Sequence, residues 1–91
     1  MPIHIRIPTP LRKLTSGTDV VAIEGSTVDE ILTSLDQVYP GMRERICDEH
    51  GNVRRFINIF VNGEDIRFLQ EKATTVTDGD EVSIVPAMAG G

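Results

Sequence analysis

The chain has 91 residues, of which 40% are hydrophobic and 25% charged, and its formal net charge is −5 at pH 7. This size and composition predict one small globular domain, without the roughly 20-residue apolar run of a membrane span. The negative charge argues against nucleic acid or an anionic membrane as partner and favours a basic protein surface. A single cysteine, Cys47, and the lack of a signal-peptide pattern predict a cytoplasmic protein.

The first half of the chain predicts two strands and a helix. Apolar and polar residues alternate from Ile3 to Ile7, which is typical of a half-buried strand closed by prolines, and residues 20–23 form a second apolar run. Thr27 and Glu30 have the spacing of a helix capping box. The apolar face of the expected helix consists of Val28, Ile31, Leu32, Leu35 and Val38, next to Tyr39, and Pro40-Gly41 ends it.

The second half begins with a charge-rich stretch, residues 42–55, that we expect to be irregular. Ile57, Ile59 and Val61 then alternate with Phe56, Asn58 and Phe60, which predicts a strand, and the Asn62-Gly63 turn follows it. We expect a brief fourth pairing within residues 65–69 and a last strand over residues 81–85, after the Asp78-Gly79 turn.

This order of elements predicts an α+β fold, a mixed sheet with one main helix packed on one face. If the first and last strands pair as central neighbours, the fold is the ubiquitin-like β-grasp. We expect a single domain over residues 1–91, with a folded body at 1–85 and an extended, flexible Gly-Gly tail at 86–91.

The tail is the most informative feature. Its two glycines have no Cβ and form a thin thread, and Gly91 carries the α-carboxylate. Residues 86–91 reach about 20 Å when extended, enough to enter the active site of another protein. A frayed terminus without function is the alternative, because last residues are commonly disordered.

The hairpin Phe56-Ile57-Asn58-Ile59-Phe60-Val61-Asn62-Gly63-Glu64-Asp65, the turn Asp78-Gly79-Asp80-Glu81-Val82 and the ending Ile84-Val85-Pro86-Ala87-Met88-Ala89-Gly90-Gly91 resemble the MoaD/ThiS family of ubiquitin-like sulfur carrier proteins. The resemblance covers essentially the whole chain. Within the family, length and ending are most similar to the carrier that supplies sulfur for cysteine synthesis. The small subunit of molybdopterin synthase, in molybdenum cofactor biosynthesis, is the alternative, and the thiazole-synthesis carrier ranks third.

The resemblance implies a carrier and co-substrate rather than an enzyme, with no bound cofactor. A partner adenylyltransferase similar to the ubiquitin-activating enzyme would use ATP to adenylate Gly91, and a sulfur donor would convert it to a thiocarboxylate. The second partner would be a sulfur-accepting enzyme, either a PLP-dependent cysteine synthase or the large subunit of molybdopterin synthase. The residues expected to thread into a partner are Gly90, Ala89, Met88, Ala87 and Pro86.

Three further groups of residues were weighed as sites. If Ile57 faces the helix, Phe56, Asn58 and Phe60 lie on the open face of the sheet and predict a partner-docking surface. Cys47-Asp48-Glu49-His50 is interpreted as a solvated loop, and no metal site is predicted, since structural zinc usually needs four ligands. Asp78, Asp80 and Glu81 are either a solvated turn or an acidic rim that meets a basic partner.

Three functions remain open at this point. An activated Gly91 that receives sulfur defines a sulfur carrier, whereas attack on it by a lysine amine would make the chain a ubiquitin-like protein modifier with isopeptide conjugates. The third is a β-grasp interaction module with an inert tail. The sequence predicts the same adenylate for the first two, so only the product distinguishes them.

Overall fold

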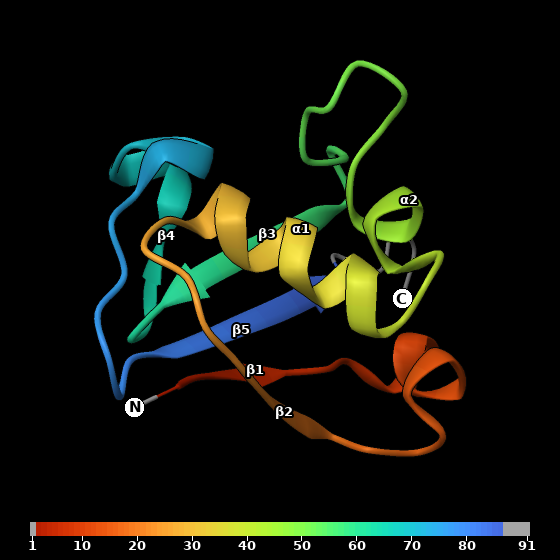
Figure 1. Ribbon diagram of the computed structural model, residues 1–91. Coiled ribbons are helices and arrows are strands. Elements are labelled where there is room, and N and C mark those ends of the chain that lie inside the picture. The colour runs from red at the N-terminus through yellow and green to blue at the C-terminus, as the bar shows by residue number, and fades with distance from the viewer. Residues whose placement is uncertain (1, 87–91) are drawn as a thin grey trace.

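The computed structural model describes residues 2–86 (Figure 1). The predicted roles of Ala87, Met88, Ala89, Gly90 and Gly91 therefore fall outside the described residues.

The described residues form a five-stranded mixed sheet in the order β2-β1-β5-β3-β4. The strands are β1 (Ile3–Arg6), β2 (Val20–Ile23), β3 (Ile57–Val61), β4 (Glu64–Asp65) and β5 (Glu81–Pro86). β1 runs parallel to β5 and antiparallel to β2, and β3 runs antiparallel to both β5 and β4. The first and last strands are thus neighbours near the middle of the sheet, which confirms the β-grasp prediction.

Helix α1 (Val28–Val38) crosses one face of the sheet (Figure 1). Its start is fixed by the predicted capping box: Thr27 Oγ1 accepts the Glu30 N–H at 3.2 Å, and Glu30 Oε1 accepts the Ser26 N–H at 2.8 Å. The helix ends at Val38, with Tyr39 as its C-cap immediately before Pro40, as predicted. Val38 is 56% exposed, so its assignment to the buried stripe was wrong: it lies in the last turn, at the margin of that stripe.

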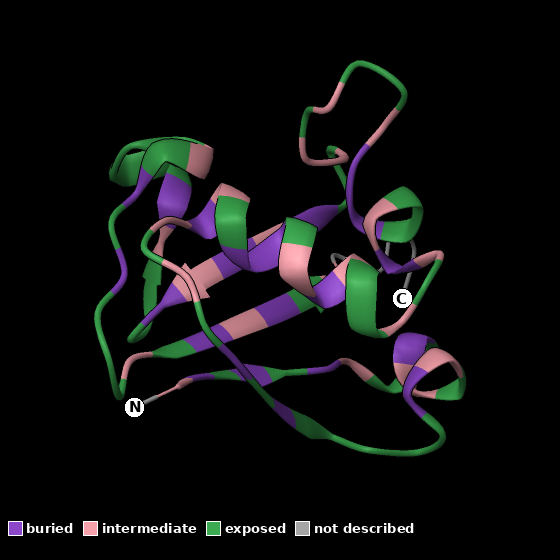
Figure 2. Ribbon diagram, in the orientation of Figure 1, coloured by how far each residue is buried: buried purple, intermediate pink, exposed green. Residues whose placement is uncertain are grey.

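The core lies between α1 and the sheet, and the strands alternate buried and more exposed residues (Figure 2). β3 and β5 follow this alternation as predicted, with Ile57, Ile59 and Val61 of β3 and Val82 and Ile84 of β5 buried. No helix within residues 2–86 is long and apolar enough to cross a membrane.

The stretch 42–55 is not wholly irregular, because it begins with a second helix, α2 (Met42–Ile46). Met42 and Ile46 lie one turn apart and are both buried in the core. Asp36 Oδ1 accepts the N–H groups of Gly41 and Arg43, at 3.1 and 3.0 Å, which ties the start of α2 to α1.

Two cations, Arg43 and Lys72, add further contacts between α1 and the stretch 42–55. Arg43 Nη2 lies 2.9 Å from Asp29 Oδ1, and Lys72 Nζ lies 3.9 Å from the same oxygen. Lys72 also donates a hydrogen bond to the Gly51 carbonyl. Cys47 and Val53 form an isolated antiparallel bridge at the base of the loop between them.

Three short 3-10 helices complete the fold: η1 (Thr9–Thr15), η2 (Ile66–Phe68) and η3 (Glu71–Ala73). The sequence predicted no helix between the first two strands. Leu11 and Thr15 of η1 are nevertheless buried, so this segment extends the core beyond the end of β1.

Pro86 corrects the predicted boundary of the tail, because it is the last residue of β5 and is paired with Ile57. The Asn62 N–H donates to the Glu81 carbonyl at 2.8 Å, and hydrogen-bonded pairs alternate along an antiparallel ladder from there. The Ile57–Pro86 pair falls at a non-bonded position. A proline without an N–H therefore fits there at no cost to the ladder.

We expect Met42→Ala to lower the free energy of unfolding by about 2–5 kcal/mol, because it removes buried side-chain volume between α2 and the core. Arg45→Ala, on the exposed side of the same helix, is the matched control and is expected to change it by no more than about 0.5 kcal/mol. Urea denaturation measures both. Equal effects of the two variants would contradict the packing of α2 into the core.

Candidate functional site

The end of β5 is the base from which the predicted tail extends. At this end β5 is paired with β3 up to Ile57–Pro86, whereas its pairing with β1 ends three residues earlier, at Arg6–Ser83. The predicted tail therefore extends from a strand that is paired with β3 up to its last residue, at the same end of the sheet as η1 and α2 (Figure 1).

A hollow of about 280 Å³ lies beside this base, between the end of β1, η1 and the end of β5. Its walls are stiffened by hydrogen bonds to the backbone: Arg12 Nε donates to the Ile7 carbonyl at 3.0 Å, and the buried Thr15 hydroxyl lies 2.7 Å from the Thr18 carbonyl. Arg6, Arg12 and Asp19 are the charged residues that line it. The surroundings of the base are thus an ordered, mixed-charge surface.

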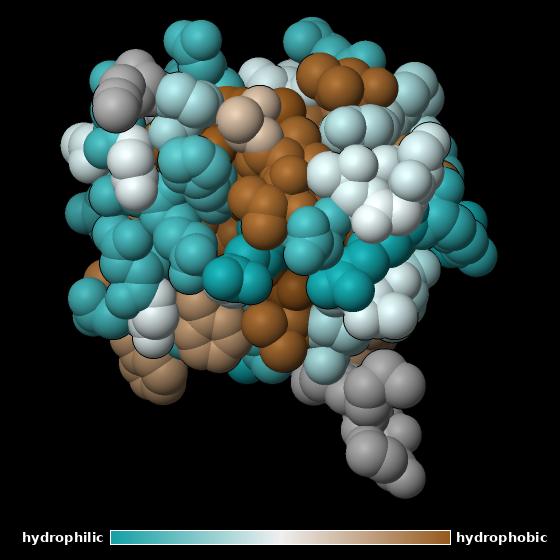
Figure 3. Space-filling model, turned by 90° about the horizontal axis from the view of Figure 1, so that it is seen from below, coloured by the Kyte–Doolittle hydropathy of each residue, from teal (hydrophilic) through white to brown (hydrophobic). Residues whose placement is uncertain are grey.

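The predicted docking residues Asn58 and Phe60 lie on the open face of the sheet. Both are half-buried, and they alternate along β3 with the residues that face the core. The register places Val85 beside Asn58 and Ser83 beside Phe60. Across β5 and β1, Arg6 and then the exposed Val20 continue the same row. Seen from the β2 side, an apolar band crosses the middle of the surface (Figure 3).

The sequence did not identify Val20 and Val85 as members of this face. They are 37% and 42% exposed, and the only signal for them is the register between strands that are distant in the sequence. Phe56 is 51% exposed and lies just before β3. The sequence also did not single out Phe68, which at 85% is the most exposed large apolar side chain among residues 2–86.

The two turns that carried the family resemblance are bonded to each other. Asn62 Nδ2 donates to Asp80 Oδ1 at 3.0 Å, and Asn62 Oδ1 accepts the Glu81 N–H at 3.0 Å. Asp80 Oδ2 accepts the Thr77 N–H at 2.9 Å. The hydrogen bond from Asn62, and then that from Thr77, hold the pKa of Asp80 below its ordinary value.

This acidic turn lies at the start of β5, at the opposite end of the strand from Pro86. The Asp80 carboxylate is engaged inside the protein, and Glu81 Oε2 lies 3.1 Å from Arg6 Nε on the neighbouring strand. These contacts give Asp80 and Glu81 structural roles in the turn.

The sequence placed Cys47 in a solvated loop, and this was wrong. Cys47 is 2% exposed and packs in the core. Burial raises the pKa of its thiol. His50, in contrast, is exposed. Within residues 2–86 no group of three or more His, Cys, Asp or Glu side chains is arranged to hold a metal ion.

The sheet order, the helix across one face and a final central strand that ends at a predicted Gly-Gly tail define the ubiquitin-like class of carrier proteins. A model of the ThiS family matches residues 5–91. The sulfur carrier protein CysO of Mycobacterium tuberculosis is 43% identical over 93 aligned positions that span all of both chains. The chain therefore belongs to the ThiS family, and it is a sulfur carrier of the CysO kind, not an enzyme.

Two further proteins are similar. A chain of the Amycolatopsis orientalis BexX/CysO complex superimposes with a TM-score of 0.92 at 40% identity, over 98% of this chain and 99% of that one. The small archaeal modifier protein 3 of Haloferax volcanii is 37% identical over 68 residues, which cover 75% of this chain and 73% of that protein.

We expect Asp80→Asn to destabilise the fold by about 1 kcal/mol at neutral pH, because it removes the charge on which both turns depend. Since the pKa of Asp80 is lowered by folding, its contribution is present above the ordinary aspartate range and is lost as the pH falls through the folded pKa. Thermal unfolding of the wild type and of Asp80→Asn, measured from pH 7 to acid pH, should therefore show a difference in stability that becomes smaller as the pH falls.

Asp19→Asn is the control, because the Asp19 side chain is exposed and forms no hydrogen bond or ion pair among residues 2–86. A difference between Asp80→Asn and the wild type that is constant with pH, or equal to that of Asp19→Asn, would contradict this role.

Proposed function

We propose that Gly91 is the sulfur-bearing residue of this carrier. Its carboxylate would attack the α-phosphate of ATP on a partner adenylyltransferase, forming an acyl-adenylate and releasing pyrophosphate. A hydrosulfide equivalent from a sulfur donor would then attack the carbonyl carbon and displace AMP, leaving a thiocarboxylate. The observation that carries the proposal is the ThiS family match, which extends to the last residue, Gly91.

The chemistry explains each part of the tail. A carboxylate is a poor electrophile, so activation is needed before sulfur can add. Glycine at positions 90 and 91 adds no Cβ that would narrow a channel leading to ATP. A base held by β3 reduces the conformational freedom that is lost when the tail enters a partner, which favours binding. Pro86 and residues Ala87, Met88 and Ala89 would serve as the spacer.

We propose cysteine synthesis as the destination of the sulfur, with a PLP-dependent cysteine synthase as the acceptor. The full-length similarity to CysO supports this branch over molybdopterin synthase. The BexX/CysO complex supports the expectation that such a carrier forms a complex with a second protein. The reactions described would take place in the cytoplasm.

A second candidate function is protein modification. It is favoured by the similarity to a small archaeal modifier protein. The same adenylate at Gly91 would then be attacked by a lysine amine, and the product would be an isopeptide conjugate of higher mass. Immunoblots of the native host, beside intact-mass analysis of the free protein, distinguish the two products.

We propose that Phe60, Asn58 and Phe56 contribute to the surface that the partners contact, together with Val85. Phe60 and Val85 form an apolar area on the open face, and Val85 lies next to the last residue of β5. A partner that receives the tail would cover this area as well.

We expect deletion of Gly91 to abolish adenylation and thiocarboxylate formation while the melting temperature stays unchanged. The deletion withdraws the carboxylate by about 3.3–3.6 Å and leaves the described core intact. Gly90→Val should have the same effect by adding a side chain in the channel. The measurement is high-resolution intact mass, with alkylation of the terminus, after incubation with ATP, sulfide and the host's adenylyltransferase.

Arg45→Ala is the control for a substitution outside the tail, and its terminus should be modified to the same extent as that of the wild type. A Gly91 deletion variant that still forms an adenylate would overturn the proposal. An unmodified wild-type terminus under the same conditions would leave the interaction module as the better account.

We expect Phe60→Ala to weaken binding to the adenylyltransferase by at least about 1 kcal/mol, more than it lowers stability. The matched control is Phe68→Ala, which removes the same ring from a more exposed position on η2 rather than on β3. Calorimetric titration and thermal unfolding measure the two effects. If Phe60→Ala chiefly unfolds the protein, or if both variants bind equally, the proposed docking surface is wrong.

A further inference from the structure

A hollow of about 420 Å³ at the start of β3 is lined by four cationic side chains: Arg54, Arg55, Arg67 and Lys72. Glu71 is the one acidic residue among its lining residues. The whole chain has only nine Lys and Arg residues against 14 Asp and Glu. Nearly half of its positive charge is thus gathered at one place on an acidic protein.

Three of these cations are held by neutral oxygen atoms. Arg54 Nε and Nη2 donate to the Glu44 carbonyl at 3.1 and 2.9 Å. Arg67 Nη2 donates to the Ile57 carbonyl at 3.3 Å and to the Asn58 side chain, and Lys72 to the Gly51 carbonyl. Carbonyl groups fix the position of a cation but leave its charge uncancelled.

Carboxylates within the protein do little to neutralise the group. The contacts Arg67 Nε–Asp65 Oδ1 and Lys72 Nζ–Asp29 Oδ1 are long, at 4.0 and 3.9 Å. Arg55 is exposed, and its guanidinium has neither a hydrogen bond nor an ion pair within residues 2–86. The hollow therefore presents ordered positive charge that is available to a ligand.

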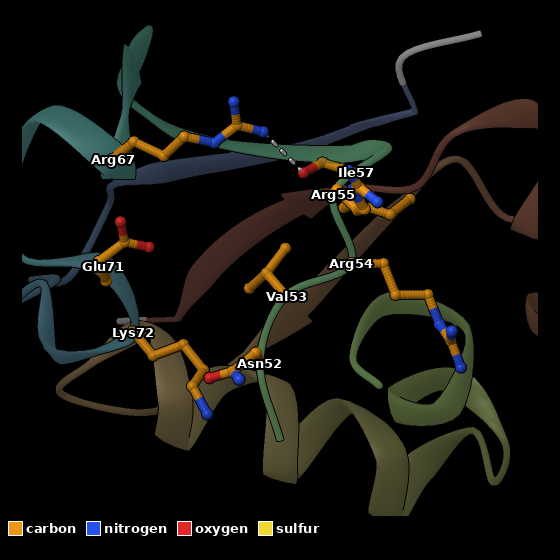
Figure 4. Close-up of a pocket in the computed structure, with 8 residues that line it drawn as sticks. All are labelled: Asn52, Val53, Arg54, Arg55, Ile57, Arg67, Glu71 and Lys72. Carbon is orange, nitrogen blue, oxygen red and sulfur yellow. Dashed lines mark hydrogen bonds between the residues drawn. The ribbon is translucent and has the colours of Figure 1, made fainter. Parts of the chain in front are cut away.

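The arrangement of the cations indicates the shape of that ligand. Figure 4 shows the four side chains spread around Val53 and pointing in different directions, so that they do not converge on one point. A single small anion could contact only a subset of them. An extended segment with several carboxylates could meet them in turn, while the half-buried Val53 offers it apolar contact.

We propose that this hollow is a docking site for an acidic segment of a partner protein. Charge complementarity argues for the occupant, and the position adds to it, because Ile57 both lines the hollow and pairs with Pro86. A segment bound here lies beside the base of the tail. The site is separate from the chemistry of Gly91, and its existence does not depend on whether sulfur or an amine is transferred.

The test is an NMR titration of the full chain with a capped poly-glutamate peptide, and in parallel with inorganic phosphate. The peptide is expected to shift amide signals of residues 52–57 and 67–72, and its affinity should fall as salt is added. Arg55→Glu should weaken binding about three- to tenfold, since it replaces one attraction by one repulsion without removing a contact within the described fold.

Arg45→Glu is the matched control, because it makes the same charge change at an exposed position outside the hollow. Equal loss of affinity in both variants would reduce the effect to net charge and overturn the proposal. If phosphate shifts the same amide signals and binds as tightly as the peptide, the hollow is an ion site rather than a docking site. If the peptide does not shift these signals, the proposal is also overturned.

Discussion

β5 pairs with β1 in parallel on one side and with β3 in antiparallel on the other, so the last strand of the chain becomes the middle strand of the sheet. Its buried residues, Val82 and Ile84, lie in the core under α1. The remaining elements are arranged around this strand. A central strand is the part of a sheet that opens least readily, because both of its edges must lose their hydrogen bonds first.

The residues that make this chain recognisable divide between the two ends of β5. At its start, Asn62 and Asp80 join two turns through hydrogen bonds and set the register of β3 against β5. At its end, Pro86 closes the ladder where no N–H is needed. One part of the family pattern therefore specifies the fold, and the other part, beyond Pro86, belongs to the proposed chemistry.

Periodicity predicted the strands and α1 well, because each buries one face and repeats with its own period. It did not predict α2, whose five residues are too few to show a period and whose N-cap, Gly41, has a positive φ and no capping side chain. The buried pair Met42 and Ile46 was the available signal. For the candidate site, β3 could be oriented from its own alternation, but Val20 and Val85 join it only through long-range register.

Cys47 has a consequence for the handling of sulfur. The acyl-adenylate is an electrophile, and a free thiolate in the same molecule would compete with the sulfur donor for it, displacing AMP to form a thioester. The core encloses the only thiol of this chain and disfavours its ionised form, which is the nucleophilic one. The Cys47 thiol is thereby kept from attacking an acyl-adenylate at the terminus of its own chain or of a second copy.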